Sequence, residues 1–324
     1  MNFQNLEYFL VVAEEKNITR AAERLHLSQQ ALSGHIIRLE EEVGCPLFER
    51  KPALTLTYAG ECFRDQALQM MNLKYQSESM MRDIRANEKG QLRIGISYSR
   101  GQALLPRVLP EYSIKHPLVD LSIVEDDAPG LQAKILQGAL DVIVGFLPFT
   151  SQDLECRPLF DEHFFLVLPK KLCQDTYAEC VPELIREFTE TGDLTPFQDL
   201  PYVLLRKGEH IRKKIDAELK NLRLSLNVRI ETSNTQTALA LAAAGMGATI
   251  VHESLLKSSY TLGGLSSPET REKVEILPFK KSILVDTIGI AWHRDRYLPK
   301  STKDFIELCE EKLHLFGFRK EEGA

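Results

Sequence analysis

A row of short polar side chains follows Ser28, at positions that one outer face of a helix would carry. Gln29, Gln30 and Ser33 offer amide and hydroxyl groups, which both donate and accept hydrogen bonds. When a helix lies in the DNA major groove, glutamine can bond both edge atoms of adenine, and serine suits either kind of partner. The first N–H groups of a helix can also bind a phosphate. DNA reading is one interpretation of this segment, and a small helical bundle with a polar surface is the other.

A second set of polar groups falls where predicted strands end, in the C-terminal two thirds of the chain. Ligands of open α/β sheets bind outside the carboxyl ends of the strands. Hydroxyls and free N–H groups at helix starts, with arginine nearby, predict a small anionic or polar effector. Ordinary helix capping by Ser99 and Ser233 is the alternative. The residues at these strand ends are Ser97, Tyr98, Ser99, Arg100, Phe146, Leu147, Arg206, Lys207, Thr232, Ser233 and Asn234.

Sequence signs of catalysis are lacking. The chain has no P-loop, G-x-S-x-G, G-x-G-x-x-G or H-E-x-x-H motif. Its 8 histidines are scattered, and its 6 cysteines form no C-x-x-C pair and no metal spacing with histidine. We therefore predict that the protein is not an enzyme and that it uses no cofactor and no metal.

Length and charge limit the class of protein further. The chain has 324 residues, so two or three domains are expected. With 40 basic and 46 acidic residues the net charge is −6, which excludes a generally basic nucleic-acid coat and leaves only a local DNA-binding patch. Glu7, Glu14 and Glu15 interrupt the apolar N-terminus, and the apolar run from Ala238 to Val251 is too short to span a bilayer. A cytoplasmic protein with reduced thiols is expected.

The elements that must position the Ser28 segment are short helices. Apolar spacing predicts a first helix over Phe3 to Glu15 and a third over Ser28 to about Val43, ended by Gly44. Thr19 is expected to cap a short second helix, and the turn at His26 gives a helix-turn-helix pattern.

A strand and a long helix come next. The alternation of Leu54 and Leu56 predicts a β-wing, with Arg50 and Lys51 as candidate phosphate contacts. Thr57 can then cap a helix from Tyr58 to about Asn87, followed by a hinge at Asn87 to Gly90. Its apolar stripe would pack either on its own wing or, as we favour for so long a helix, on a partner helix. The stripe consists of Phe63, Ala67, Met70, Lys74, Ser77, Met81 and Ile84.

From Gln91 onward, strands and helices alternate, which predicts a mainly parallel sheet covered on both faces. Two such series predict two subdomains beside a cleft, over about 91–162 plus 275–324 and about 163–274. Residues 173–193 predict an additional helix, which would cover the cleft, extend an interface or fill a surface loop.

Residues 1 to about 62 resemble, almost without gaps, the winged helix-turn-helix of LysR-type transcriptional regulators. The resemblance is carried by two segments, FLVVAEEKNITRAAERLHLSQQALSGHIIRLEEEVGCPLFER and LTLTYAGE. The resemblance implies a DNA-binding domain over 1–60, a dimerising linker helix over 58–89 and an α/β effector domain over 91–324, similar in fold to periplasmic binding proteins. Three features depart from the family: Gln30 where it usually has proline, Gly34 where it often has arginine, and an arginine-poor wing.

The resemblance also implies partners and roles. It implies double-stranded DNA with a pseudo-palindromic operator, a small-molecule effector and a homodimer or homotetramer, with no membrane. Residues 1–60 carry 6 basic and 8 acidic groups, so we expect weak nonspecific DNA binding with a shallow salt dependence. The implied DNA-contact residues are Ile18, Thr19, Arg20, Ala21, Ser28, Gln29, Gln30, Ser33, Gly34, Ile37, Arg38, Arg50 and Lys51.

Three alternatives stay open beside a DNA-binding regulator switched by an effector. Peroxide sensors occur among LysR-type regulators, and Cys173 and Cys180 form the one close cysteine pair. Asp175 and Glu179 lie between them, however, and acidic neighbours do not lower a thiol pKa. The other two alternatives are an α/β ligand-binding protein without DNA binding and an enzyme.

Overall fold

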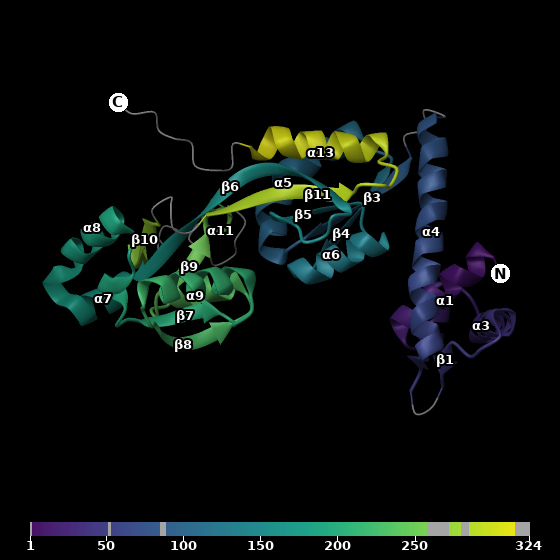
Figure 1. Cartoon of the computed structure of the whole chain (residues 1–324), viewed down its shortest axis with the longest axis horizontal. Helices are drawn as coiled ribbons and strands as arrows, with labels where there is room; N and C mark the ends of the chain where they lie inside the picture. Colours follow the sequence, from purple (N-terminus) through teal and green to yellow (C-terminus); the bar gives the residue numbers. More distant parts are fainter. Residues whose placement is uncertain (1, 51–52, 85–88, 258–271, 280–284, 315–324) are drawn as a thin grey trace.

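The computed structural model describes residues 2–50, 53–84, 89–257, 272–279 and 285–314. Figure 1 shows a small head at the N-terminus, the long helix α4 rising from it, and an α/β body of two lobes beside that helix. The predicted order of a helical head, a long helix and an α/β region is therefore confirmed. In the described part of the chain, no helix is both long and apolar enough to cross a membrane.

The head packs three helices around one apolar core. Leu32, Ile36 and Leu39 recur at helical spacing on one side of the third helix, and all three are buried against Phe9 and its neighbours. Ser28 caps this helix as predicted, because its hydroxyl accepts from the N–H of Ala31 at 3.2 Å. The helices are α1 (Phe3–Glu15), α2 (Ile18–Arg24) and α3 (Gln29–Val43).

The cap of α2 differs from the sequence prediction. Asn17, not Thr19, is the N-cap, and its side-chain oxygen accepts from the N–H groups of Thr19 and Arg20 at 2.9 and 3.1 Å. Asparagine and threonine both cap well, so the choice depended on where the first helical turn lies, and it begins at Ile18. At the other end of the pair, Gly44 ends α3 in the left-handed conformation with φ 82°, as predicted.

The wing is a short antiparallel pair, β1 (Phe48–Glu49) and β2 (Thr55–Leu56). Glu40 of α3 fixes its base, because one carboxylate oxygen accepts from the N–H groups of Leu47 and Phe48 at 2.8 and 3.1 Å. The helix that follows is held equally closely: a Cβ at Gly60 would collide with the carbonyl of Leu47. The wing strands, α3 and the beginning of α4 are therefore packed closely together.

The long helix α4 (Tyr58–Ile84) divides its predicted stripe between two roles. Phe63 and Ala67 pack in the core of the head. The first half of the stripe therefore packs on the helix's own winged domain, which was one of the two predicted alternatives. Met70 and Met81 are 36% and 50% exposed, which leaves the second half for another partner. The predicted hinge begins at 87–88, outside the described residues.

The first lobe is built on parallel strands. The strands β4 (Val119–Glu125) and β5 (Val142–Phe146) flank β3 (Gly90–Ile96) in parallel. Their core includes Tyr112 of α5 and Phe305 of α13, both fully buried. The helices of this lobe are α5 (Tyr98–Lys115), α6 (Ala128–Gln137) and α13 (Lys300–Leu313).

Two long strands continue from the first lobe toward the second. β11 (Val285–His293) pairs antiparallel with β5 and with β6 (Leu154–Pro169), and the far half of β6 pairs antiparallel with β9 (Thr249–His252) and β10 (Val274–Pro278). The expected mainly parallel sheet is therefore wrong for this central part, because a chain that returns directly along its neighbour pairs antiparallel. The sequence predicted that the chain returns to the first lobe near residue 275. Leu277 of β10 instead packs in the core of the second lobe, so the return lies further along the chain.

The second lobe has a smaller sheet and its own core. β7 (Pro201–Leu205) and β8 (Asn227–Thr232) are parallel, and Tyr202 and Phe164 are fully buried beside them. Its helices are α7 (Lys170–Tyr177), α8 (Val181–Thr191), α9 (His210–Leu222), α10 (Thr235–Ala243) and α11 (Glu253–Lys257).

The additional segment predicted at 173–193 is the α7–α8 pair. Phe188 of α8 is fully buried and lies 5.1 Å from the ring of Phe279, so the predicted apolar stripe packs on the core of the second lobe. Figure 1 places α7 and α8 at the far end of that lobe, away from the first. Of the three roles left open, covering the cleft is thus excluded.

Candidate DNA-binding surface and effector cleft

The outer face of α3 carries the predicted polar row. Gln29 and Gln30 are exposed, Ser33 is half-buried and Ile37 is 41% exposed, on the side of the helix turned away from its buried leucines. Because the cap at Ser28 and the wing contact through Glu40 hold both ends of α3, these side chains stand on a fixed support. The arrangement can present amide and hydroxyl groups to an extended partner.

Gly34 lies in the same row and has open space around it. A Cβ at this position would meet only the Arg38 guanidinium, at 3.9 Å. Glycine in a helix interior costs about 0.5–1 kcal/mol relative to alanine. No intramolecular contact therefore requires this glycine.

Several predicted DNA-contact residues are committed to other partners. Ala21 is fully buried in the head core, so its side chain cannot reach DNA, and this prediction is wrong. It was included because the whole helix pair matched the family, although the inner side of α2 faces the core. Arg38 bonds the carbonyl of Gly34 at 3.1 Å, and Arg20 bonds that of Glu15 at 3.1 Å.

The remaining positions of the head differ in their exposure. Thr19 is exposed and Ile18 is half-buried against the core. Arg50 of the wing base is paired with Glu40 at 3.3 Å, and Lys51 lies outside the described residues. Gln29 and Gln30, at the beginning of α3, are exposed and, unlike Arg20, Arg38 and Arg50, have no side-chain partner in the described part of the chain.

A buried ionic cluster lies where the two lobes meet. Arg100 of α5 is paired with Glu162 of β6 at 2.6 Å, and their side chains are 4% and 0% exposed. Glu162 also accepts from the Ser254 hydroxyl and lies 3.3 Å from Nδ1 of His252. Burial alone would raise the pKa of Glu162, but Arg100 and His252 hold it well below its usual range. The carboxylate is therefore charged and neutralises Arg100.

Phe146 links the lobes through both faces of its ring. The Arg100 guanidinium lies 3.9 Å from the ring centroid, and the His210 ring of α9 stacks on it at 3.8 Å. His210 is in turn 3.2 Å from the carboxylate of Asp286, a buried residue of β11. The sandwich joins α5, β5, α9 and the connecting strand β11 in one cluster.

The predicted strand-end residues approach one another from the two lobes. Ser97 is the N-cap of α5 without a side-chain cap bond, and its hydroxyl lies 3.4 Å from Arg100. Asn234, rather than Ser233, caps α10, accepting from the N–H groups of Gln236 and Thr237. Gln236 donates to Gln102 of α5, so the beginnings of α5 and α10 lie side by side.

The other members of the set lie around these helix starts. Ser99 lies within the first turn of α5 and caps nothing, so the predicted capping role is wrong for this residue and for Ser233. Tyr98 is 48% exposed, Arg206 is exposed, and the Thr232 hydroxyl accepts from the N–H of Asn234 at 3.2 Å.

Sequence reasoning missed five residues of this cluster between the lobes: Glu162, His210, His252, Ser254 and Asp286. One signal was present, because Glu162 stands with Asp161 and His163 directly before the apolar run Phe164–Leu168. Charged residues inside buried strands require partners. The partners of Glu162 could not be predicted from the sequence, because Arg100 lies 62 residues away and Ser254 lies 92 residues away.

The cysteine pair is poorly placed for redox chemistry. Cys173 is buried, and burial raises the pKa of its thiol to about 11, so little thiolate forms near neutral pH. Cys180 is exposed, and both cysteines are free thiols. Within the described ranges, no group of three or more histidine, cysteine or carboxylate side chains could hold a metal ion.

Two family profiles cover most of the chain. Residues 3–61 match the bacterial regulatory helix-turn-helix proteins of the lysR family, and residues 85–314 match the LysR substrate binding domain. The chain belongs to the LysR family of DNA-binding transcriptional regulators with an effector-binding domain.

Individual relatives agree with this assignment. The chain is 26% identical to the uncharacterized HTH-type transcriptional regulator YcgK of Bacillus subtilis, over 97% of this chain and 95% of that protein. It is 39% identical over 170 residues to the Hca operon transcriptional activator HcaR of Escherichia coli, which covers 52% of this chain and 57% of HcaR.

Solved structures share the arrangement of the whole chain. A full-length OxyR variant from Pseudomonas aeruginosa superposes with a TM-score of 0.68 at 27% identity, covering 97% of this chain and 95% of OxyR. CbnR in complex with its target DNA gives 0.67 at 20% identity, covering 96% of this chain and 100% of CbnR, a likeness of fold.

Proposed function

We propose that this regulator reads its operator through Gln29, Gln30 and Ser33 of α3 and that a small polar molecule in the cleft between the lobes controls it. The observation that carries the DNA part is the exposure of Gln29 and Gln30, beside the half-buried Ser33, on a helix held by its cap and by the wing. Thr19 and Arg50 lie on the same head and would contact the phosphate backbone.

The DNA part is tested by footprinting the chain's own upstream region. A Gln29→Ala/Ser33→Ala variant should lose the protected site, because each base contact contributes about 1–3 kcal/mol. Gln66→Ala is the matched control, since Gln66 is exposed on α4 outside the row. Unchanged protection by the double variant overturns the assignment of these residues.

The chemistry of the effector follows from the groups in the cleft. Arg100 already has its charge neutralised by Glu162, which favours a polar ligand over one that needs this arginine as its counter-ion. In the described structure, Nε of Arg100 and Nε2 of His252 are buried without a hydrogen-bond partner. Such groups are costly to leave unpaired, and an oxygen of a small ligand would satisfy them. Arg206, exposed at the end of β7, remains for any carboxylate.

A thermal-shift screen tests this chemistry. Small carboxylic acids and their neutral amides would be compared, because a ligand that binds only the folded state raises the melting temperature. An acid that stabilises the chain should lose its effect in Arg206→Ala and keep it in Arg229→Ala, an exposed arginine of β8. If every stabilising ligand retains its full effect in variants of Arg206 and Ser97, the proposed cleft is wrong.

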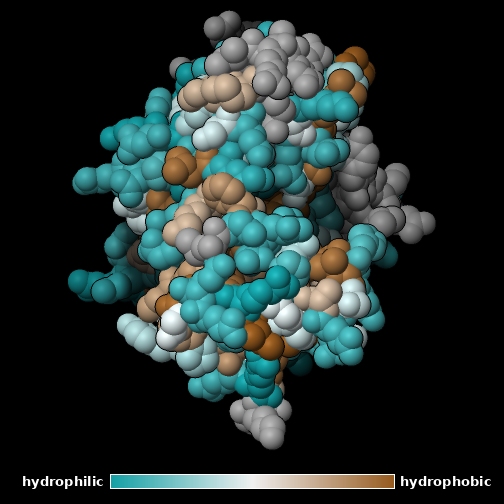
Figure 2. Space-filling view, turned by 90° about the vertical axis from the view of Figure 1, so that its right-hand side faces the viewer, coloured by the Kyte–Doolittle hydropathy of each residue, from teal (hydrophilic) through white to brown (hydrophobic). Residues whose placement is uncertain are grey.

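Association of copies completes the proposal. The exposed apolar side chains of α4 include Met70, Leu73, Met80 and Met81, and an apolar groove of about 550 Å³ lies along α5 and β4. Figure 2 shows separate hydrophobic patches on the largely hydrophilic side of the molecule that carries α4. Two such surfaces support a homodimer or a homotetramer. Leu73→Glu should reduce the mass measured by light scattering, and an unchanged mass would exclude the α4 surface.

Regulation without catalysis is part of the same proposal, supported by relatives that are transcriptional regulators. The thiol-switch alternative is disfavoured by the burial of Cys173. Counting accessible thiols before and after peroxide treatment would revive it if two thiols were lost together.

A further inference from the structure

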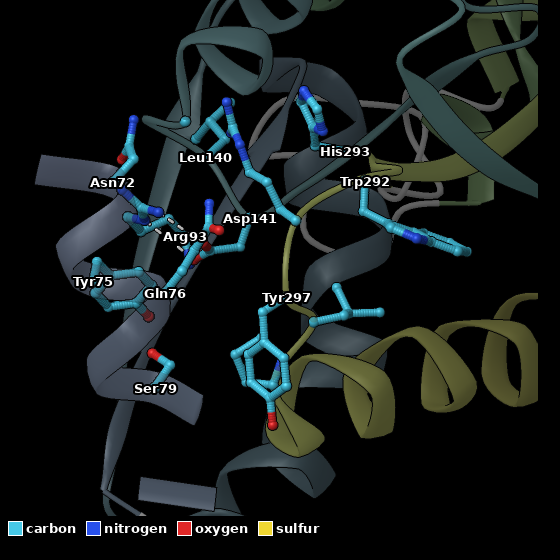
Figure 3. A pocket seen from close by; sticks show the side chains of 14 residues that line it. Asn72, Tyr75, Gln76, Ser79, Arg93, Leu140, Asp141, Trp292, His293 and Tyr297 are labelled. Carbon is cyan, nitrogen blue, oxygen red and sulfur yellow. Dashed lines mark hydrogen bonds and ion pairs between the residues drawn. The ribbon is translucent and has the colours of Figure 1, made fainter. Parts of the chain in front are cut away.

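The linker helix α4 has a polar face that is distinct from its apolar one. Asn72, Tyr75, Gln76 and Ser79 recur at three- and four-residue spacing, so they share one side of the helix. Asn72 and Ser79 are only 9% and 3% exposed, whereas Leu73 is 66% exposed. Figure 3 shows these four side chains projecting from α4 toward Arg93 and Asp141 of the first lobe. Because Tyr75 and Gln76 are half-buried, the polar face lies against the protein's own body without being fully enclosed by it.

The last turn of α6 receives hydrogen bonds from this region. A helix leaves its last four carbonyl groups without partners inside the helix. Arg296 donates to the carbonyls of Ile135 and Leu136 at 2.7 and 2.5 Å, and the Asn72 amide of α4 donates to the carbonyl of Gln137. The linker helix thus completes the C-terminal cap of a helix in the effector domain.

Gly138 leaves room for this contact. It follows α6 with φ 80°, a conformation that favours glycine, and a Cβ there would collide with the Asn72 amide. The turn after α6 and the side chain of α4 are therefore fitted to each other.

Tyr75 provides a second anchor, one turn further along α4. Its hydroxyl donates to the carbonyl of Gln91 at 2.6 Å, and its ring lies 4.8 Å from the Arg93 guanidinium. Two Arg93 nitrogens bond Asp141 at 2.7 and 3.1 Å, and its backbone N–H bonds the same carboxylate at 2.8 Å. The tyrosine therefore rests on an arginine that cannot turn freely.

The helix α6 connects this contact to the cleft. It begins at the N-cap Asp127, just beyond the carboxyl end of β4, at the edge of the sheet where Ser97 and Phe146 also lie. It ends beside α4, at the opposite edge of the sheet. Its 10 residues span about 15 Å at ~1.5 Å per residue.

We propose that Asn72 and Tyr75 are positioning residues of a docking face, through which the first lobe fixes the angle of the linker helix. Helix α6 then carries a displacement at the cleft to that helix and hence to the DNA-binding head. The signalling half of this inference rests on the proposed effector function, and the docking half does not.

The docking half is tested on the full-length oligomer with Asn72→Ala/Tyr75→Phe. Spin labels on Cys62 of α4 and Cys156 of β6, both exposed, report the angle of the linker, with Cys180→Ser as a common background. Labelled chains are diluted with unlabelled ones, so that distances within one protomer are measured. Gln76→Ala is the matched control, because Gln76 lines the same small cavity and the described structure gives it no hydrogen bond.

The parent and the control should each give one narrow distribution of the distance between the labels on Cys62 and Cys156. The double variant should give a broad distribution instead. The far-ultraviolet circular dichroism of all three should agree, which separates a lost dock from a lost fold. An equally narrow distribution in the folded double variant overturns the dock.

The signalling half is tested without a ligand. Phe146→Ala removes the aromatic link between the lobes, and its effect on affinity for the upstream DNA is measured in the parent and in the Asn72→Ala/Tyr75→Phe background. We expect a change of about fivefold or more in the parent, within the usual range of coupling between sites, and its loss in the undocked background. Equal changes in both backgrounds overturn the route through α6. No change in the parent instead contradicts control of the head by the cleft, which is the proposed function itself.

Discussion

Gln29 and Gln30 stand exposed on a helix of the head, whereas Arg100 and Glu162 are buried and paired between the lobes of the body. The first surface needs no rearrangement to meet a partner, because its side chains are accessible and their support is fixed. In the second, most of the charged and hydrogen-bonding groups are already paired with one another. In the function proposed above, a ligand that enters there would displace contacts such as the Phe146–His210 stack, and such displacement could shift the balance between two arrangements of the lobes.

The largest effect is expected from breaking the buried pair. Glu162→Ala leaves the Arg100 charge in the interior without its partner, which should lower the free energy of unfolding by about 3–5 kcal/mol. Urea denaturation measures the change. Glu310→Ala is the control, because it removes a comparable pair with Arg157 at the surface, where about 1 kcal/mol or less is expected. Equal losses for both variants would show that the cleft is not a closed, desolvated cluster.

Acid should weaken the same cluster. The pKa of Glu162 is depressed in the folded chain, so its stabilisation is present above the ordinary value of 4.5 and is lost as the pH falls through and below it. Glu162→Gln should therefore lose less unfolding free energy than the unmodified chain between about pH 5 and pH 3. Parallel pH profiles would contradict the charged state assigned to Glu162.

A middle-sized effect is expected from opening the aromatic link. Phe146→Ala removes apolar contacts with both lobes and should cost about 1.5–3 kcal/mol of unfolding free energy. Ile114→Ala, at a position 82% exposed, should stay within about 0.5 kcal/mol. If the two variants melt at the same temperature, the claim that Phe146 stabilises the contact between the lobes is wrong.

The smallest effect concerns the open face of the head. Gly34→Ala should stabilise the chain by about 0.5–1 kcal/mol, because a Cβ meets open space and glycine weakens a helix. Affinity for the operator should be unchanged if Gly34 is merely tolerated. A more stable protein that has lost operator binding would show instead that DNA approaches the backbone at this residue.

The head was predictable from sequence because its signals are local. Apolar spacing located α1 and α3, while Ser28 and Gly44 marked the ends of α3, since caps act within a few residues. The cap of α2 was misplaced because Asn17 and Thr19 are both good caps two residues apart. The polar row of α3 followed from the same periodicity.

The cleft was only half predictable for the opposite reason. Strand ends pointed to Ser97, Arg100 and Asn234, but the partner that neutralises Arg100 is Glu162 of β6, which lies 62 residues away in the chain. A single sequence also cannot show that α4 divides its faces between the head core, the body and the outside, because one periodicity serves all three contacts.

Competition binding at modest ionic strength tests the central claim most directly. Labelled upstream DNA is displaced from the full-length protein by unlabelled random duplex, for the unmodified chain and for Gln29→Ala/Ser33→Ala. We predict a clear preference for the upstream region in the unmodified chain, lost in the variant, and weak random binding with a shallow salt slope, because residues 1–60 carry more acidic than basic groups. Equal affinity of the unmodified chain for both duplexes would contradict the account.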